Sequence, residues 1–187
     1  MISTSDFRKG LKIEINDEPF NIVEFQHVKP GKGNAFVRTR MKSLITGNVL
    51  EKTFKSGEKV AKPDLENKKV QYLYNDGENY IFMDMETYDQ LEISGKQLGN
   101  ATLFMQEQME TEVLFYKGEP IDIELPTFIE VDVVRTDPGV RGDTVSGATK
   151  PAEIETGATI QVPLFLNESD RIRVDTRTGT YVERVKR

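Results

Sequence analysis

Short segments of alternating apolar and polar residues, separated by turn-forming residues, recur along the chain. The N-terminal part shows them most clearly, at residues 11–15, 20–28, 35–42 and 49–54. Because the side chains of a strand point alternately to its two faces, this period of two predicts half-buried β-strands. Several short strands joined by tight turns within one such stretch favour a small β-barrel or SH3-like unit.

Two boundaries divide this pattern into three parts. The first lies near Pro63, and the second lies near Phe128, just after Pro126 and Thr127. The middle part also favours a short helix within residues 91–103. We therefore predict an all-β chain of three consecutive small domains, at residues 1–63, 64–128 and 129–187.

The composition limits the kinds of site that the chain can hold. Of its 187 residues, 37% are hydrophobic and 30% are charged, which fits several small domains better than one large core. There is no cysteine, so disulfides and thiolate metal sites are excluded. The single histidine, His27, cannot by itself form an imidazole-rich metal site. We therefore predict no metal and no cofactor.

The beginning of the sequence carries no recognisable targeting signal. Residues 1–7 lack a basic start followed by an apolar run. No window of the sequence is long and apolar enough to span a bilayer. We therefore expect a cytoplasmic protein with no membrane partner.

Charge is distributed unevenly among the three parts. Residues 1–63 carry 12 Lys and Arg against 7 Asp and Glu, a net charge of +5. Residues 64–128 carry 4 against 14, a net charge of −10, and residues 129–187 carry 9 against 10, a net charge of −1. This asymmetry suggests that the basic first part faces phosphates, although solvated faces alone also produce blocks of charge.

A glycine-rich turn lies between two of the predicted strands. Pro30 fixes φ and Gly31 accepts a positive φ, so these residues favour a tight turn. The neighbours of Lys32, Gly31 and Gly33, have no side chain that could pack on it or pair with it. We expect the lysine amine at a bare loop tip, with an ordinary solvated hairpin tip as the alternative. A phosphate-binding loop is excluded, because neither the Walker spacing nor Gly-x-Gly-x-x-Gly is met.

Six segments spread over nearly the whole chain carry a family resemblance. They are His27–Arg38, Glu51–Ser56, Tyr72–Glu78, Thr136–Thr144, Lys150–Ala152 and Val162–Phe165. In order and spacing these segments resemble the bacterial elongation factor P family. The region from Lys150 to Ser169 is similar to the family's signature segment, but it departs from the family pattern at its end, where Ser169 stands in place of a frequent glycine. The resemblance implies an SH3-like (KOW-like) first barrel followed by two OB-like barrels.

The resemblance also implies a function in translation. It implies an elongation factor that binds the ribosome beside the peptidyl-tRNA and promotes peptide-bond formation at stalling sequences such as consecutive prolines. Such a factor is not an enzyme, and it is expected to act as a monomer. Lys32 corresponds to the loop-tip residue that is commonly modified in the family, so a lysine-modifying enzyme is an expected partner.

Three groups of residues are candidates for RNA contacts. They are, in chain order, Arg38, Arg40 and Lys42, then Gly142, Asp143 and Thr144, then Tyr181 and Arg184. The first group alternates onto one face of the strand behind the loop tip. The second lies in a long loop that, by the resemblance, faces the small ribosomal subunit and the messenger RNA. The third could stack on and pair with RNA, or form an ordinary last strand with its aromatic ring in the core.

Two other functions remain open at this point. One is a generic RNA-binding module that uses the basic strand face. The other is a carboxylate-based hydrolase built on Asp84, Glu86, Asp89 and Glu92, whose spacing allows two carboxylates to lie near each other. A solvated acidic face explains the same four residues.

Overall fold

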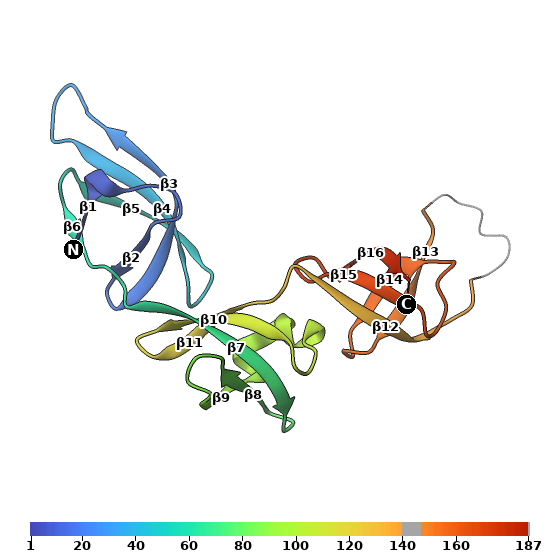
Figure 1. Cartoon of the computed structure of the whole chain (residues 1–187). Coiled ribbons are helices and arrows are strands. Elements are labelled where there is room, and N and C mark those ends of the chain that lie inside the picture. The colour runs from blue at the N-terminus through green and yellow to red at the C-terminus, as the bar shows by residue number, and fades with distance from the viewer. Residues whose placement is uncertain (140–146, 187) are drawn as a thin grey trace. The chain divides into compact units, whose positions relative to one another are not determined.

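The computed structural model describes residues 1–139 and 147–186 (Figure 1). Strands make up 56% of it and helices 7%, and its sheets curl into half-barrels, so the predicted all-β class is confirmed. Two compact units are present: unit 1 contains Met1–Asn67 and Leu114–Asp122, and unit 2 contains Lys68–Val113 and Ile123–Arg187. None of the helices described is long and apolar enough to cross a membrane.

Unit 1 is built on an antiparallel sheet whose four strands follow one another along the chain. These strands are β2 (Lys12–Ile15), β3 (Glu18–Val28), β4 (Phe36–Ser43) and β5 (Val49–Lys55). A second sheet pairs β1 (Ile2–Ser3) with β6 (Lys59–Val60), and the 3-10 turn η1 (Thr4–Asp6) follows β1. β6 shows that strand pairing in unit 1 continues almost to the predicted boundary near Pro63.

β4 shows how the sequence pattern becomes the wall of a barrel. Its odd-numbered residues from Val37 to Ser43 are buried, and its even-numbered residues from Arg38 to Lys42 are exposed, as the alternation predicts. Fully burying a large apolar side chain contributes roughly 1.5–3 kcal/mol to folding, so the core fixes which face of β4 points inward. The core of unit 1 consists of Phe7, Ile13, Phe20, Ile22, Val37, Met41, Phe54 and Val60.

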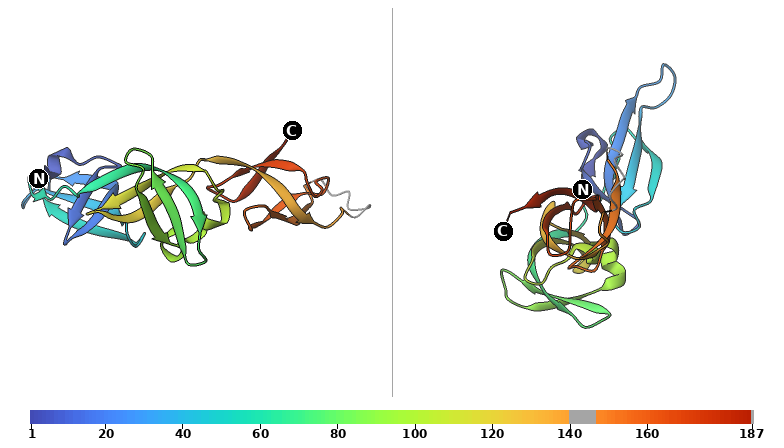
Figure 2. Two further views of the ribbon diagram at one scale, coloured as in Figure 1. Left: turned by 60° about the horizontal axis from the view of Figure 1, so that its bottom comes forward. Right: turned by 90° about the vertical axis from the view of Figure 1, so that its right-hand side faces the viewer.

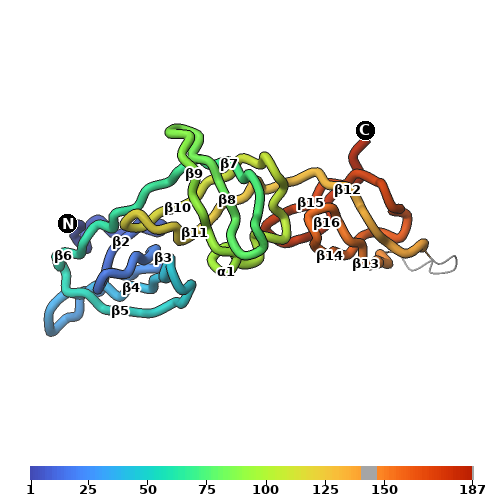
Figure 3. The backbone as a smooth tube through the Cα atoms, turned by 90° about the horizontal axis from the view of Figure 1, so that it is seen from below, coloured from blue at the N-terminus to red at the C-terminus, as the bar shows by residue number. Residues whose placement is uncertain are grey.

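The middle of the chain forms a five-stranded sheet with the order β11-β10-β7-β8-β9 (Figure 3). The strands are β7 (Leu65–Asn75), β8 (Asn79–Asp84), β9 (Gln90–Ser94), β10 (Glu110–Tyr116) and β11 (Glu119–Glu124). A short helix, α1 (Gly95–Leu98), and a 3-10 segment, η2 (Gly99–Phe104), follow β9. The short helix predicted within residues 91–103 is therefore confirmed, and it begins after Ser94 because β9 pairs with β8 as far as that residue. The Ser94 hydroxyl then caps α1 by accepting a hydrogen bond from the Gln97 amide.

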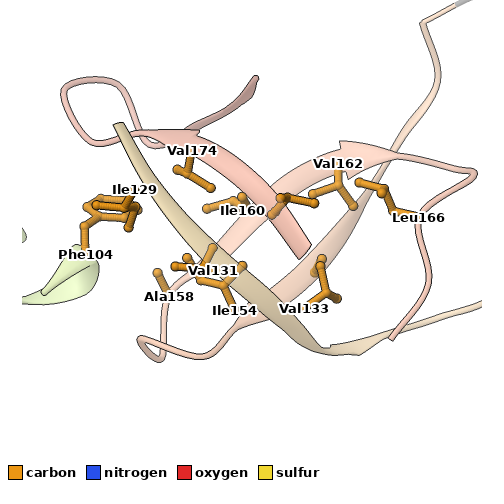
Figure 4. Close-up of a cluster of buried hydrophobic side chains, with 12 residues drawn as sticks. Phe104, Ile129, Val131, Val133, Ile154, Ala158, Ile160, Val162, Leu166 and Val174 are labelled. Atoms are coloured by element: carbon orange, nitrogen blue, oxygen red, sulfur yellow. The ribbon is translucent and has the colours of Figure 1, made fainter. Parts of the chain in front are cut away.

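The last part of unit 2 is another five-stranded antiparallel sheet, with the order β14-β13-β12-β15-β16. The strands are β12 (Phe128–Thr136), β13 (Thr149–Ile154), β14 (Thr159–Pro163), β15 (Arg171–Asp175) and β16 (Thr180–Val185). β12 is central, because it pairs with β13 on one side and with β15 on the other. The inward faces of these strands supply a core of valine, isoleucine and alanine side chains (Figure 4).

One core residue of this C-terminal sheet comes from the middle part of the chain. Phe104, at the end of η2, is 8% exposed and belongs to the same apolar cluster as Ile129 and Val174 (Figure 4). Gly179 lies beside it, with φ +68°, and a Cβ at that position would come within 3.1 Å of the Phe104 ring. Both the backbone conformation and the close ring therefore favour glycine at residue 179.

Candidate functional site

The loop between β3 and β4 projects beyond the strands of unit 1 (Figures 1 and 2). The two strands stay paired up to Val28 and Phe36, so the loop comprises residues 29–35, with Lys32 at its centre. All of its residues up to Asn34 are exposed. The amine of Lys32 thus stands at the free end of a long antiparallel pair.

Glycine shapes the loop, but not at the position that the sequence favoured. Gly33 has φ +111°, whereas Gly31 is not in the left-handed region where we expected it. The expectation was wrong because Pro30 presets only its own φ and does not decide which later residue reverses the chain. A Cβ at Gly33 would lie 3.8 Å from Pro30 Cγ, so the backbone conformation, and not crowding, is what calls for glycine there.

The loop is held at its base and not at its tip. The amide of Ser56 donates a hydrogen bond of 3.0 Å to the carbonyl of Ala35, which ties the end of the loop to the strand beside it. Residues 30–34 make no hydrogen bond or ion pair with any part of the chain that the structure describes. The Lys32 amine is therefore available to an external partner while the strands behind it stay fixed.

The exposed face of β4 is mixed in charge. Arg38, Arg40 and Lys42 all point to solvent. Arg40 lies in register with Glu24 on β3 and Glu51 on β5, and Arg38 Nε is 3.6 Å from Glu51 Oε1. Arg38 and Arg40 help to line a shallow hollow of about 270 Å³, together with Glu24 and Glu51. The sequence pattern showed the cations but missed the two acids, because their proximity depends on the register between strands.

The C-terminal candidates differ from one another in exposure. Tyr181 packs against the C-terminal core, and burial raises the pKa of its phenol. Arg184 is exposed, and its guanidinium lies 5.6 Å from the centre of the Phe165 ring, which is 58% exposed. Tyr181 thus packs as an aromatic residue of the core, as expected of an ordinary last strand. The side chain of Arg184 is exposed to solvent. Gly142–Thr144 lie outside the described residues.

One acidic residue of the middle part, Asp84, shapes a turn. The Asp84 carboxylate, 6% exposed, accepts hydrogen bonds from the amides of Glu86 (2.8 Å) and Thr87 (3.1 Å). The hydrogen bond from Glu86, and after it the one from Thr87, lowers the pKa of Asp84. The ammonium of Lys68 lies 4.0 Å from Asp84 Oδ2. Nowhere in residues 1–139 or 147–186 do three His, Asp or Glu side chains gather as a metal site requires. The Asp84 carboxylate therefore has a structural role in this turn.

Three sequence models of one family match the chain in succession. The elongation factor P KOW-like domain matches residues 3–60, the elongation factor P OB domain matches residues 65–123, and the elongation factor P C-terminal domain matches residues 129–184. The chain belongs to the elongation factor P family. The resemblance carried by the six sequence segments is thereby confirmed.

Relatives of the same length agree with this family. Elongation factor P of Pelotomaculum thermopropionicum is 54% identical over 185 residues, which cover 99% of this chain and 100% of the relative. Elongation factor P of Maridesulfovibrio salexigens is 55% identical over 186 residues, which cover 100% of both chains. The family places the chain among the translation elongation factors.

Solved structures share the fold at lower sequence identity. Eukaryotic translation initiation factor 5A from Methanococcus jannaschii matches 66% of this chain and 93% of its own, with a TM-score of 0.55 and 24% identity. A translation initiation factor 5A family protein from Naegleria fowleri matches 66% of this chain and 96% of its own, with a TM-score of 0.54 and 20% identity. At this identity the likeness concerns the arrangement of the strands alone.

Proposed function

We propose that this elongation factor binds the ribosome beside the peptidyl-tRNA and promotes peptide-bond formation at stalling sequences such as consecutive prolines. The observation that carries the proposal is the position of Lys32, exposed at the centre of a projecting loop whose tip has no partner in the described chain. The family supports interaction with the ribosome. The length of the β3–β4 pair supports delivery of the amine into a narrow space.

The Lys32 amine acts in this proposal by positioning and by charge. It reaches the CCA end of the peptidyl-tRNA and holds it in a productive geometry, which reduces the entropy that the ribosome's own transfer step must lose. No bond is made or broken by the factor, so it is not an enzyme. A lysine-modifying enzyme that acts on Lys32 extends the reach of the side chain and adds hydrogen-bond donors.

RNA contacts are proposed for three further surfaces. Arg38, Arg40 and Lys42 face tRNA phosphate, which their exposure supports and the nearby acids Glu24 and Glu51 weaken. The second surface is the loop that contains Gly142, Asp143 and Thr144, which faces the small subunit. The third is Arg184, with Tyr181 beside it on β16.

The same proposal covers how the protein is organised. It works as a cytoplasmic monomer of three domains, at residues 1–63, 64–128 and 129–187. The rival function is a generic RNA-binding module, which the exposed cations of β4 also fit. A factor of the proposed kind prefers ribosomes to free RNA of the same length, and a generic module does not.

Replacement of Lys32 tests the proposal directly. Lys32→Ala is expected to abolish relief of stalling on a triproline reporter, while the free energy of unfolding changes by less than about 0.5 kcal/mol because the side chain is exposed. Lys32→Arg is also expected to fail or to fall well short, because the guanidinium is broader and is no substrate for a lysine-modifying enzyme. The measurements are reporter translation and thermal melts of each variant.

Lys29→Ala is the matched control, since Lys29 is an exposed lysine of the same loop. It is expected to keep most of the reporter activity. Wild-type relief by Lys32→Ala would overturn the proposed mechanism. Unfolding of Lys32→Ala would show that the lysine is structural.

A further inference from the structure

Unit 1 contains a segment from far along the chain. Leu114–Asp122 includes the end of β10, the turn and most of β11, and it packs with residues 1–67. The family match assigns this hairpin to the OB domain, at residues 65–123. The tip of an OB-domain hairpin is therefore part of the N-terminal unit, and polar contacts of its side chains join it to that unit.

The first contact is a buried hydrogen bond. The phenol of Tyr116 donates to Glu14 Oε2 at 2.5 Å. Tyr116 is 7% exposed, and the side chain of Glu14, on β2, is 15% exposed. A hydrogen bond to a carboxylate that is largely shielded from water is one of the stronger polar contacts in a protein.

The second contact joins the tips of two hairpins. The ammonium of Lys117 lies 2.8 Å from Asp17 Oδ1 and 3.9 Å from Glu14 Oε2. The amide of Lys117 also donates to the carbonyl of Asp64 at 3.0 Å. The hydrogen bond with Asp17, followed by that with Tyr116, raises the pKa of Lys117, so the lysine stays charged.

Both hairpins have turns that present these side chains. Asn16 and Asp17 have φ of 51° and 60°, and Lys117 and Gly118 have φ of 49° and 82°. Two successive residues with positive φ are the signature of the tight primed turns that join neighbouring strands. Asp17 and Lys117 therefore stand at the tips of tight turns. We name the four side chains Glu14, Asp17, Tyr116 and Lys117 the hairpin clamp.

The hairpin clamp and the Lys32 loop lie at opposite ends of one strand. β3 begins at Glu18, next to Asp17, and ends at Val28, where the loop starts. An 11-residue strand is about 35 Å long, so a tilt of about 5° at its first residue moves its far end by about 3 Å. A misplacement of about 1 Å can cost about a hundredfold in rate when an effect depends on positioning.

We propose that Glu14, Asp17, Tyr116 and Lys117 are positioning residues, which lock the β10–β11 hairpin onto the N-terminal sheet and so set the direction in which β3 presents Lys32. This inference rests on the proposed function of Lys32. The clamp touches neither the tRNA nor the loop and acts only through the orientation of the strand.

A distance measurement tests the clamp without the ribosome. The chain has no cysteine, so cysteines introduced at the exposed positions Asn48 and Glu119 can be spin-labelled selectively. Both sites lie in unit 1, one beyond β4 and one on the hairpin. A narrow distance distribution is expected in the otherwise wild-type chain, and a broad one after Tyr116→Phe with Lys117→Glu. An unchanged distribution overturns the clamp.

The reporter tests whether the clamp matters for function. Lys117→Glu is expected to raise the factor concentration needed for half-maximal relief about tenfold, the equivalent of one lost hydrogen bond to a charged group. Adding Asp17→Lys restores the opposite charges and is expected to recover most of the loss. Tyr116→Phe removes only the phenol oxygen and is expected to lower relief without a change of charge. Failure of the swap to recover activity, with both variants folded by thermal melts, overturns the positioning role.

Lys69→Glu is the matched control, because Lys69 forms an exposed ion pair with Glu110 at 3.8 Å in unit 2. It carries the same charge reversal and is expected to leave relief unchanged. An equal loss in the control assigns the effect to net charge and overturns the clamp's role. Lys32→Ala separates the two proposals: wild-type relief by that variant removes the function, whereas the spin-label distances still decide whether the clamp exists.

Discussion

The cations of β4 and the cations of the C-terminal sheet are placed in different surroundings. Arg40 and Lys42 form no ion pair within the described residues, and Arg38 has only Glu51 at 3.6 Å. In the C-terminal part, three arginines each have a carboxylate close by. The pairs are Arg171 with Asp132 at 3.1 Å, Arg173 with Glu130 at 3.3 Å, and Arg177 with Asp175 at 2.9 Å.

This difference separates charge that is available for binding from charge that is already used. A guanidinium paired with a carboxylate must give up that partner before it can bind a phosphate. An exposed cation with a distant partner, or with none, attracts phosphate at no such cost. The net charges of the parts already predicted that the first part, and not the last, faces phosphates. The ion pairs add which individual cations have a carboxylate partner.

The largest effect expected from this difference is on ribosome binding. Replacing Arg38, Arg40 and Lys42 with alanine is expected to weaken binding and to flatten its dependence on salt, because fewer counterions are exchanged. Each phosphate contact accounts for roughly 0.7 to 0.9 in the slope of log affinity against log salt. The measurement is equilibrium binding to purified ribosomes over a range of salt concentrations.

The matched control removes the same number of charges from the C-terminal sheet. Alanine at Arg171, Arg173 and Arg177 is expected to lower the melting temperature, because Glu130, Asp132 and Asp175 lose their partners. The salt slope of ribosome binding should stay close to that of the wild type. Equal slopes for the two triple variants would erase the distinction between free and paired cations.

The next largest effect is expected from acid, which should lower the stability of the fold by protonating carboxylates that have partners. The side chain of Arg177 lowers the pKa of Asp175, and hydrogen bonds from backbone amides lower that of Asp76, as they do for Asp84. A carboxyl group with a lowered pKa in the folded state stabilises the fold above its unfolded pKa, about 3.9. This stability is lost as the pH falls through the lower, folded value. The melting temperature is therefore expected to fall steeply below about pH 4.

Asp175→Asn sharpens the acid prediction. The variant is expected to melt earlier than the wild type at neutral pH, because the charged pair with Arg177 is gone. The two melting curves should converge as the pH falls through the lowered pKa of Asp175 in the folded state, since the wild-type carboxylate is then protonated as well. Parallel curves across the whole pH range would show that Asp175 is not responsible.

The smallest effect concerns the buried face of β4. The side chain of Thr39, between Arg38 and Arg40, is fully buried, and its hydroxyl has no hydrogen-bond partner in the described structure. Thr39→Val removes this unsatisfied group at nearly constant shape and is expected to raise the free energy of unfolding by about 1 kcal/mol. Chemical denaturation measures the change. A change in the salt slope of ribosome binding would mean that the two faces of β4 are not independent.

Much of this architecture could be predicted from the sequence, because it is local. Alternation fixed the faces of β4, and turn residues separated the strands of both units. Ser169 shows the strength of that local pattern. It takes φ +71°, the conformation that favours glycine, and its amide still donates to the carbonyl of Val133 at 2.8 Å. The turn therefore forms with serine in a left-handed conformation.

The parts that could not be predicted depend on contacts between distant segments. The proximity of Glu51 to Arg38 depends on the register of β4 and β5. Tyr116 and Phe104 look like ordinary strand and helix aromatics in the sequence, but one binds Glu14 and the other fills the C-terminal core. Periodicity assigns such residues to a buried face, but it does not say which part of the chain their side chains pack against.

The discontinuity of unit 1 has a consequence for how the chain matures during its own synthesis. Residues 1–67 leave the ribosome first, but the hairpin that completes their unit, Leu114–Asp122, follows only after another 46 residues, 68–113. At 5–20 residues per second, that interval is about 2 to 9 s. Throughout that interval Glu14 lacks its tyrosine partner and Asp17 its lysine, so the contacts of the hairpin clamp form only when the middle of the protein has been made.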